Sequence, residues 1–496
     1  MSDEAWREYR QALPVTVADS ARTCLLQEYV PLMKERLDLG RHAGALPRTR
    51  EPVYRWVRYK EAYSPHLVRE ILDELVPKLS GRQGHDSPVL YDPMAGSGTS
   101  LLVAAERGMP ALGADLMPYA TFITSVMIRW RQADPALVQQ VADSALSGYD
   151  AMPGRERLDV PAARWAFAPA VATTLTQLLN VVDRAAAGVN RDLVRLAILS
   201  AVEQVSYTVK DGISVRRRLP DGPARPGRPG QQRKAMDAAD VIAGVRQRVG
   251  AVVEDLEQAR SVSGRGPAGA RDLSEKGMAL PVSASARTGL PRAAQLAVVQ
   301  ADAREWGPAR ESCGVVVFSP PYPNRYDYSA IYQLELALGD FVSGAAELRR
   351  LRKELLRSHL EAPPRDEYRV ELPALREFLA AVNASRVKGD QSGRVLRMVA
   401  GFFEDMTDVL LRVAEALRPG GSVGLVVSTQ TYLGQHLPTD LLLAEVGRSV
   451  GLEVQALWVV RLKGVASQQR RIARSSGRET VLVMRKPPSS RRRSRQ

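Results

Sequence analysis

An apolar run that ends at two consecutive prolines restricts the fold of this chain more than any other segment. Residues 315–318, Val-Val-Val-Phe, are typical of a buried strand. Pro320 and Pro321 end that strand, because proline has no N–H for a sheet ladder and cannot enter a helix interior. The segment Ser319-Pro320-Pro321-Tyr322 is therefore a rigid turn after a strand. In an open α/β sheet, ligands bind at the carboxyl ends of the strands.

Strand-like and helix-like segments alternate along much of the chain, which predicts an α/β fold with a mostly parallel, doubly wound sheet. Residues 462–477 are polar and basic and have no apolar stripe. The last two strands should therefore pair antiparallel across a long loop. The seven predicted strands are residues 88–92, 110–115, 296–300, 314–319, 421–428, 452–461 and 478–485.

Shifts in composition divide the chain into a core and several additions. Residues 1–50 are expected to form an N-terminal helical arm, and residues 487–496 form a basic tail. The core comprises residues 51–130, 296–342 and 400–486. A mainly helical insertion with basic, flexible linkers should occupy residues 131–295, and a second insertion should occupy residues 343–399.

The net charge of +14 favours a polyanionic partner. Arginines gather in residues 214–234 and 461–478 and in the tail. Phosphate contact is the favoured interpretation for residues 461–478, whereas the tail is equally well explained as a solvated, arginine-rich end. With only two cysteines and five scattered histidines, the sequence predicts neither a disulfide framework nor a metal site.

No signal peptide or transmembrane helix is expected, because the acidic N-terminus has no apolar core behind it and the apolar stretches are too short. Together with the low cysteine count, this predicts a cytoplasmic protein.

A second strand-terminating turn, which lies upstream, is rich in glycine. The sequence Asp92-Pro93-Met94-Ala95-Gly96-Ser97-Gly98-Thr99 follows a strand and begins a helix. Glycine permits a tight turn and close approach of a ligand, and a helix N-terminus offers free N–H groups to a carboxylate. The next strand ends at Asp115, which can accept hydrogen bonds from ribose hydroxyls or cap the helix that follows.

Together these two turns resemble those of the bacterial site-specific amino-methyltransferases of DNA. Enzymes of this family use S-adenosylmethionine to methylate the exocyclic nitrogen of cytosine or adenine. The resemblance covers residues 54–130, 295–340 and 400–486, and it implies a class I methyltransferase sheet of seven strands with an antiparallel last hairpin.

The resemblance also assigns a cofactor site. Asp92 would receive the ammonium of the methionine arm or its hydration shell, Asp115 the ribose, and Asp302 the adenine amino group. Ser64 and Pro65 would open a helix beside the methionine arm, although they are also an ordinary N-cap and first helical residue. The predicted cofactor residues are Tyr63, Ser64, Asp92, Pro93, Met94, Ala95, Gly96, Ser97, Gly98, Thr99, Asp115, Leu116, Asp302 and Ala303.

The predicted catalytic residues are Ser319, Pro320, Pro321 and Tyr322. The Ser319 hydroxyl and the Pro320 carbonyl would accept the two amine hydrogens of a base flipped out of the duplex, and Tyr322 would stack on that base. Serine at the first position is typical of the cytosine-N4 branch of the family. Carbon-5 methylation would need a cysteine nucleophile, and Cys313 is expected to lie in the core.

Double-stranded DNA is the expected partner, with a restriction nuclease or other defence subunits as further candidates. Either insertion could recognise the target sequence, and residues 323–328 are expected to join the base pocket. The candidate DNA contacts are Lys210, Arg216, Arg217, Arg218, Asn324, Arg325, Gln468, Gln469, Arg470 and Arg471. The alternatives are adenine-N6 methylation, methylation of an RNA amine, and a catalytically silent DNA-binding subunit.

Overall fold

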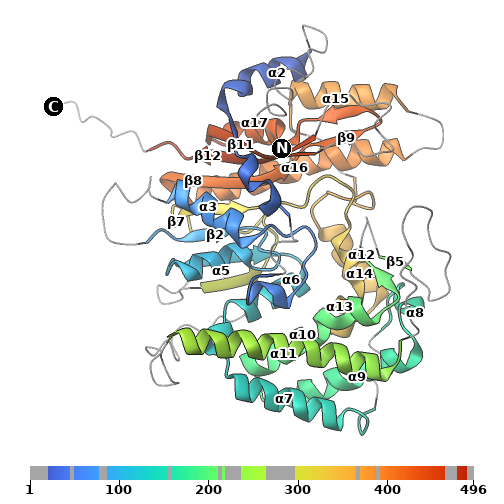
Figure 1. Ribbon diagram of the computed structural model, residues 1–496. Coiled ribbons are helices and arrows are strands. Elements are labelled where there is room, and N and C mark those ends of the chain that lie inside the picture. Colours follow the sequence, from blue (N-terminus) through green and yellow to red (C-terminus); the bar gives the residue numbers. More distant parts are fainter. Residues whose placement is uncertain are drawn as a thin grey trace.

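The computed structural model describes residues 20–44, 50–76, 87–153, 158–210, 215–217, 236–263, 296–364, 369–386, 391–463 and 477–488. Within these residues the chain is organised around an eight-stranded sheet with the order β1-β11-β12-β8-β7-β2-β3-β6 (Figure 1). The strands are β1 (Met33–Glu35), β2 (Leu90–Asp92), β3 (Ala111–Asp115), β6 (Leu296–Gln300), β7 (Cys313–Phe318), β8 (Leu417–Ser428), β11 (Glu453–Lys463) and β12 (Gly477–Arg485).

The strand directions confirm the predicted doubly wound sheet. β6, β3, β2, β7 and β8 run parallel to one another. β12 lies between β8 and β11 and runs antiparallel to both. All seven predicted strands are present, and the last two form the expected antiparallel pair.

The N-terminal arm differs from the prediction, because it is not wholly helical. After α2 (Ala21–Tyr29) and a 3₁₀ turn, β1 pairs in parallel with β11 and extends the sheet by one edge strand. A second 3₁₀ turn, Leu37–His42, follows it. The three residues of β1 are Met-Lys-Glu and remain half-buried or exposed. The sequence therefore gives no apolar run by which this strand could be recognised.

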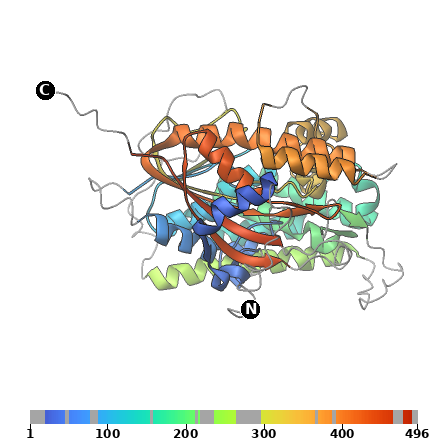
Figure 2. The same ribbon diagram turned by 90° about the horizontal axis from the view of Figure 1, so that it is seen from above.

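Helices cover both faces of the sheet. The side chains of β7 alternate between two apolar cores, with Val315 and Val317 in one and Val316 and Phe318 in the other. Cys313 is fully buried in the second core, as predicted. The first core also contains residues of α3 (Pro65–Leu75), α5 (Thr99–Glu106) and α6 (Pro118–Met127). The second contains residues of α2, α15 (Pro373–Ala384), α16 (Ser392–Ala416) and α17 (Thr439–Ser449). Figure 2 shows the orange helices and the blue α2 beside the red strands.

The apolar stripe of α3 explains how such a helix attaches to the sheet. Leu67, Ile71 and Leu75 recur every four residues and are almost fully buried. Ser64 is the N-cap, and its hydroxyl accepts a hydrogen bond from the Leu67 N–H at 3.5 Å. Pro65 occupies the first helical position, where no intrahelical N–H is needed. The start of this helix beside β2 is therefore encoded locally.

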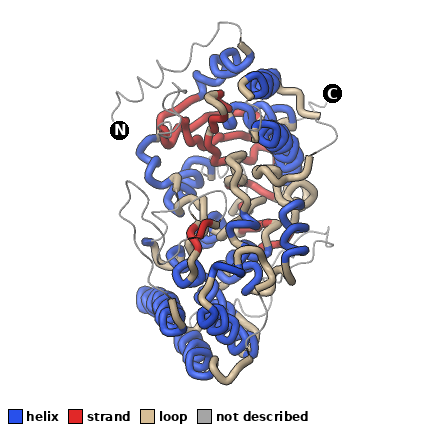
Figure 3. The backbone as a smooth tube through the Cα atoms, turned by 90° about the vertical axis from the view of Figure 1, so that its right-hand side faces the viewer, coloured by secondary structure: helices blue, strands red, loops and turns tan. Residues whose placement is uncertain are grey.

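The first insertion forms a group of helices at one end of the molecule (Figures 1 and 3). These helices pack on one another and continue the first core. They are α7 (Pro135–Gly148), α8 (Ala163–Ala166), α9 (Pro169–Arg184), α10 (Val189–Val205) and α11 (Ala238–Ser263). The short strands β4 (Thr208–Val209) and β5 (Arg216–Arg217) form a separate antiparallel pair.

The remaining elements lie near the carboxyl ends of the central strands. Three helices follow the proline turn: α12 (Tyr328–Ile331), α13 (Gln333–Leu338) and α14 (Ala345–Glu354). The strands β9 (Gln430–Tyr432) and β10 (Gln435–Leu437) form a hairpin after β8. No helix in the described ranges combines the length and the apolarity needed to cross a membrane.

Two arginines of the basic segment 461–478 correct the interpretation of that segment. Arg478 is 1% exposed and forms an ion pair with the fully buried Asp440, with an Nε–Oδ2 distance of 2.6 Å. Arg461 pairs with the buried Glu479. Both arginines lie on core strands, and carboxylates of the protein compensate their charges. Residues 464–476 lie outside the described part of the chain.

Candidate active site

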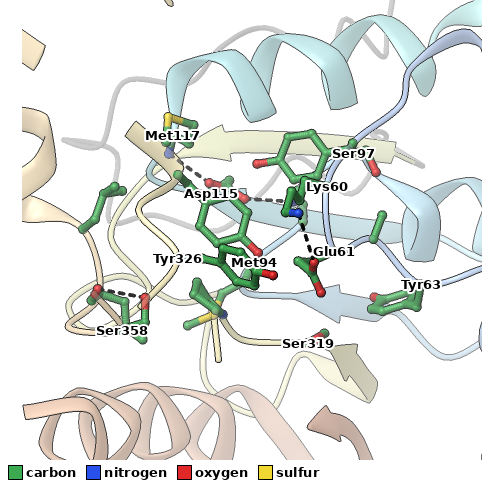
Figure 4. A pocket seen from close by; sticks show the side chains of 18 of the residues that line it. Lys60, Glu61, Tyr63, Met94, Ser97, Asp115, Met117, Ser319, Tyr326 and Ser358 are labelled. Carbon is green, nitrogen blue, oxygen red and sulfur yellow. Dashed lines mark hydrogen bonds and ion pairs between the residues drawn. The ribbon is translucent and has the colours of Figure 1, made fainter. Parts of the chain in front are cut away.

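A pocket that is partly open to solvent lies at the carboxyl ends of β2, β3 and β7. In Figure 4, Asp115 and Met117 lie on one side of it and Ser319 on another, with Tyr326 between them. It is lined by Tyr59, Lys60, Glu61, Ala62, Tyr63, Met94, Ala95, Gly96, Ser97, Thr99, Asp115, Met117, Ser319, Pro321, Tyr326, Tyr328, Leu355, Leu356, Ser358 and His359.

The glycine-rich turn forms one wall of this pocket. Gly96 and Gly98 have φ values of 55° and 75°, in the left-handed region that favours glycine. The Gly96 N–H donates to Asp115 Oδ2 at 2.8 Å, and its carbonyl accepts from the Thr124 hydroxyl at 3.1 Å. A Cβ atom on Gly98 would lie 3.0 Å from the Thr124 side chain. The turn is therefore held between the end of β3 and helix α6.

Asp115 connects this turn to the pocket. Besides Gly96, its carboxylate accepts a hydrogen bond from the Met117 N–H at 2.9 Å. The N-cap residue of α6 is Met117, so Asp115 lies two residues ahead of the cap, and its carboxylate bonds both the start of this helix and the glycine turn. Burial raises the pKa of Asp115 to about 6, although its backbone hydrogen bonds favour the charged form. Among the described residues that line the pocket, it offers the most buried carboxylate.

Asp92 lies beneath the turn and does not line the pocket, which differs from its predicted contact with the ammonium of the cofactor. It is 1% exposed, and its carboxylate accepts hydrogen bonds from the Met94 N–H at 2.9 Å and from the Ser100 hydroxyl. Tyr63 donates to it at 3.4 Å. Burial raises the pKa of Asp92 to about 7. Its place in the structure is that of a support for the glycine turn.

Asp302 also lies outside the pocket lining, although the sequence places it against adenine. Its carboxylate forms a two-pronged ion pair with Arg304, whose Nε donates to Oδ1 at 2.9 Å and whose Nη2 donates to Oδ2 at 2.5 Å. Arg304 also pairs with the buried Asp405 at 3.3 Å. The carboxylate is thus engaged with a cation from its own loop. The other predicted cofactor residues that do not line the pocket are Ser64, Pro93, Gly98, Leu116 and Ala303.

The proline turn contributes Ser319 and Pro321 to the pocket, but not Pro320 or Tyr322. The Ser319 hydroxyl points toward the Tyr322 hydroxyl at 3.5 Å, and Tyr322 donates to Glu479 at 3.1 Å. The Tyr322 ring packs against the second core. The structure therefore does not place Tyr322 on the pocket wall, where the sequence predicts stacking on the base, because its hydroxyl donates to Glu479 of β12 and its half-buried ring packs against the second core.

Other aromatic rings line the pocket instead. Tyr326 and Tyr328 come from residues 323–328, the segment expected to join the base pocket. Tyr59 stacks on Tyr332 with a centroid distance of 4.9 Å and on Tyr328 at 6.3 Å. The Lys60 ammonium lies 4.8 Å from the Tyr326 ring centre. These rings give the pocket a wall on which a planar ligand can stack.

Residues 355–359 of the second insertion also border the pocket, which the sequence did not indicate. Leu355, Leu356, Ser358 and His359 line it. They follow α14, far along the chain from either turn, and no local motif marks them. The only available signal was the presence of a histidine in a loop.

The candidate DNA contacts differ from one another in their exposure and in their partners within the protein. Lys210 must be corrected, because its ammonium forms an ion pair with Glu335 and the two side chains are only 7% and 2% exposed. The Asn324 side chain accepts a hydrogen bond from the Tyr326 N–H at 3.2 Å, and the Arg325 guanidinium lies 5.2 Å from the Tyr432 ring centre. Arg216 and Arg217 are exposed on β5. Arg218, Gln468, Gln469, Arg470 and Arg471 lie outside the described residues.

No group of three or more histidine, cysteine or acidic side chains suited to a metal ion occurs in the part of the chain that the structure describes.

The chain matches no protein-family profile. It is 25% identical over 455 residues to the type II methyltransferase M.AvaI of Nostoc sp. (strain PCC 7120) and of Anabaena variabilis, covering 88% of this chain and 87% of those proteins. It is 21% identical over 501 residues to the type II methyltransferase M.BsoBI of Geobacillus stearothermophilus, covering 93% and 91%.

Two of the matching solved structures are distant in sequence and in structure. The cyclase SpnF is 8% identical with a TM-score of 0.29, covering 95% of this chain and 93% of that one. The rRNA methyltransferase AviRa of Streptomyces viridochromogenes is 12% identical with a TM-score of 0.26, covering 85% of each chain.

The pocket fits S-adenosylmethionine. The carboxylate of Asp115 suits a ribose diol, the glycine turn suits the methionine carboxylate, and the apolar and aromatic side chains suit a purine. The strand order described above places these groups at the ends of β2 and β3. Over nearly its whole length the chain is similar to the bacterial type II methyltransferases M.AvaI and M.BsoBI, and this similarity implies S-adenosylmethionine as the cofactor.

Proposed function

We propose that the protein transfers a methyl group from S-adenosylmethionine to the N4 amine of a cytosine that is flipped out of double-stranded DNA. It would act as the modification enzyme of a restriction–modification or related phage-defence system in the cytoplasm. The observation that carries this proposal is the single pocket bordered by both the glycine turn and the Ser319 turn. Such a pocket can hold a methyl donor against a base amine.

The chemistry requires orientation of the amine more than a strong base. The lone pair of an exocyclic amine is delocalised into the ring, so the site must draw it out of conjugation and aim it at the methyl carbon. When bound, the cofactor supplies an electrophilic methyl group on a sulfonium. Proximity can then provide much of the rate, and the amine loses its proton late.

In this proposal, Ser319 orients the amine. The Ser319 hydroxyl donates toward the Tyr322 hydroxyl, which in turn donates to Glu479. The lone pairs of the Ser319 oxygen therefore remain available to accept an amine hydrogen. The Pro320 carbonyl would accept the second hydrogen. Tyr322 then acts as a positioning residue for Ser319, and Tyr326 or Tyr328 takes over the stacking on the base. The cytosine-N4 assignment rests on the serine, which is typical of that branch.

The affinity for S-adenosylmethionine should depend on the protonation of Asp115. Because its pKa is raised to about 6, the carboxylate is ionised above that pH and loses its charge below it. The ribose hydroxyls bind the ionised form, so affinity should be lost as the pH falls through about 6. Calorimetry should find binding about tenfold weaker at pH 5 than at pH 7.5, because a group with this pKa is about nine-tenths protonated at pH 5.

Asp115→Asn provides the control for this pH dependence, since its affinity should vary little between pH 5 and pH 7.5. A transition that persists in Asp115→Asn with a midpoint near 7 would assign the effect to Asp92 instead, whose pKa is raised to about 7.

Transfer of a labelled methyl group tests the proposed function. The purified protein should label double-stranded DNA and leave RNA unlabelled. Label in RNA alone would favour an RNA amine methyltransferase. Binding of both DNA and S-adenosylmethionine without any transfer would identify a silent DNA-binding subunit.

A further inference from the structure

His359 is a buried histidine on the pocket wall with no hydrogen-bond partner for either ring nitrogen. Its exposed fraction is 1%, and both Nδ1 and Nε2 lie in the interior without a partner within the described residues. His359 lines the same pocket as Ser319 and Pro321. A buried polar group without a partner is costly, so unpaired groups at a pocket point to a ligand that pairs them.

The segment that carries His359 is fixed in place from two sides. On one side, the Arg357 guanidinium pairs with the buried Asp405 of α16, and the Arg357 N–H donates to the same carboxylate at 2.8 Å. On the other, the Ser358 carbonyl accepts a hydrogen bond from the Arg325 N–H at 3.0 Å. Arg325 lies in the loop that follows the proline turn. His359 is therefore held in a constant position relative to Ser319.

The charged groups around His359 are engaged with one another. Asp327 and Arg352 form an ion pair at 2.7 Å, and Asp327 also accepts hydrogen bonds from the Ser329 hydroxyl and the Ala330 N–H. Burial lowers the pKa of His359, as does the Arg352 charge, and together they outweigh the opposing effects of Asp327, of Glu361 and of the Arg352 backbone, which lies near the imidazole without meeting hydrogen-bond geometry. The imidazole is thus neutral near pH 7, with one N–H donor and one acceptor nitrogen.

We propose that His359 is a specificity-determining residue that hydrogen-bonds the target base beside its reactive amine. This inference rests on the proposed function and names the base-reading group of that site. Ser319 and the Pro320 carbonyl provide acceptors for the amine, but a base also presents acceptors of its own. In cytosine these are N3 and O2, and the N–H of His359 is the complementary donor.

The experiment is a cycle that pairs substitution of His359 with removal of the target base. Once methylation has located the target site, the affinity of the wild type and of His359→Leu is measured for the target duplex and for the same duplex with an abasic target position. His359→Leu should weaken binding of the target duplex about tenfold or more, as expected for one hydrogen bond to a base edge. Binding of the abasic duplex should change little.

Two further variants make the result specific. His359→Gln keeps a side-chain donor and should retain part of the difference between the two duplexes. His436→Leu is the matched control, because the pKa of His436 is also lowered by burial, to about 4, while His436 does not border the pocket. That variant should behave like the wild type in the cycle. Calorimetry should find the affinity for S-adenosylmethionine within about twofold of the wild type in every variant, a limit well under one hydrogen bond.

Equal weakening of the target and abasic duplexes by His359→Leu would overturn the proposal and leave His359 as a hydrated wall residue. A loss of cofactor affinity in both His359 variants would overturn it as well, because the ring would then serve the cofactor. Failure of the proposed function is distinguishable from both, since the wild type itself would then transfer no methyl group to DNA.

Discussion

Replacing Ser319 by alanine should lower the rate of methyl transfer to DNA about 100-fold and leave the affinity for S-adenosylmethionine unchanged. The expected size is that of losing one aligned hydrogen bond at a reacting group, which costs about 100-fold or more in rate. The hydroxyl lies at the pocket with its proton directed toward Tyr322, so its oxygen can accept from the amine as the lone pair leaves conjugation. Removing an interaction that strengthens in the transition state lowers the rate of the reaction but does not weaken the binding of the cofactor.

Single-turnover kinetics with saturating DNA and cofactor would measure this effect. Ser312→Ala is the matched control, since Ser312 precedes the same strand at its opposite end and is exposed. A Ser319→Ala rate within about threefold of the wild type would be too small for one such hydrogen bond. It would remove Ser319 from the chemistry.

Asp115→Ala should weaken the binding of S-adenosylmethionine about 30-fold to 1,000-fold, which corresponds to about 2–4 kcal/mol. The loss has two sources. The ribose hydroxyls lose a charged acceptor, and the Gly96 and Met117 N–H groups lose the carboxylate that holds the glycine turn. Both effects act on the ground state of the complex, so isothermal calorimetry is the direct measurement.

Asp302→Ala is the informative comparison for that prediction. The sequence places Asp302 against the adenine amino group, whereas in the structure its carboxylate pairs with Arg304 outside the pocket. We therefore expect Asp302→Ala to change cofactor affinity far less than Asp115→Ala. Equal losses in the two variants would mean that Asp302 reaches the cofactor after all.

The sheet and its two turns could be predicted from the sequence because their signals are local. The apolar run before Ser319 and the Gly96 and Gly98 pair before α5 each carry enough information to fix a strand end and its turn. β1 could not be found in this way, because Met-Lys-Glu is neither apolar nor β-branched and becomes a strand only beside β11. Its pairing is a tertiary effect that overrides local propensity.

The roles of the basic residues were harder to predict from the sequence, because an ion pair can join residues that lie far apart in the chain. Lys210 finds its partner at Glu335, and Arg478 finds its partner at Asp440. Neither partner is near in sequence, so composition alone cannot separate a buried ion pair from a phosphate contact. The pocket wall at residues 355–359 could not be predicted for the same reason. It depends on how the second insertion packs against the loop after the proline turn.

The identity of the methylated base tests the central claim most directly. DNA treated with the wild-type protein and S-adenosylmethionine would be digested to nucleosides and analysed by mass spectrometry, with Ser319→Ala treated in parallel. We predict N4-methylcytosine in the wild-type sample and little or none with Ser319→Ala. N6-methyladenine as the sole modified base would contradict the cytosine-N4 assignment, and the absence of any methylated base, with both DNA and cofactor bound, would contradict the enzymatic function itself.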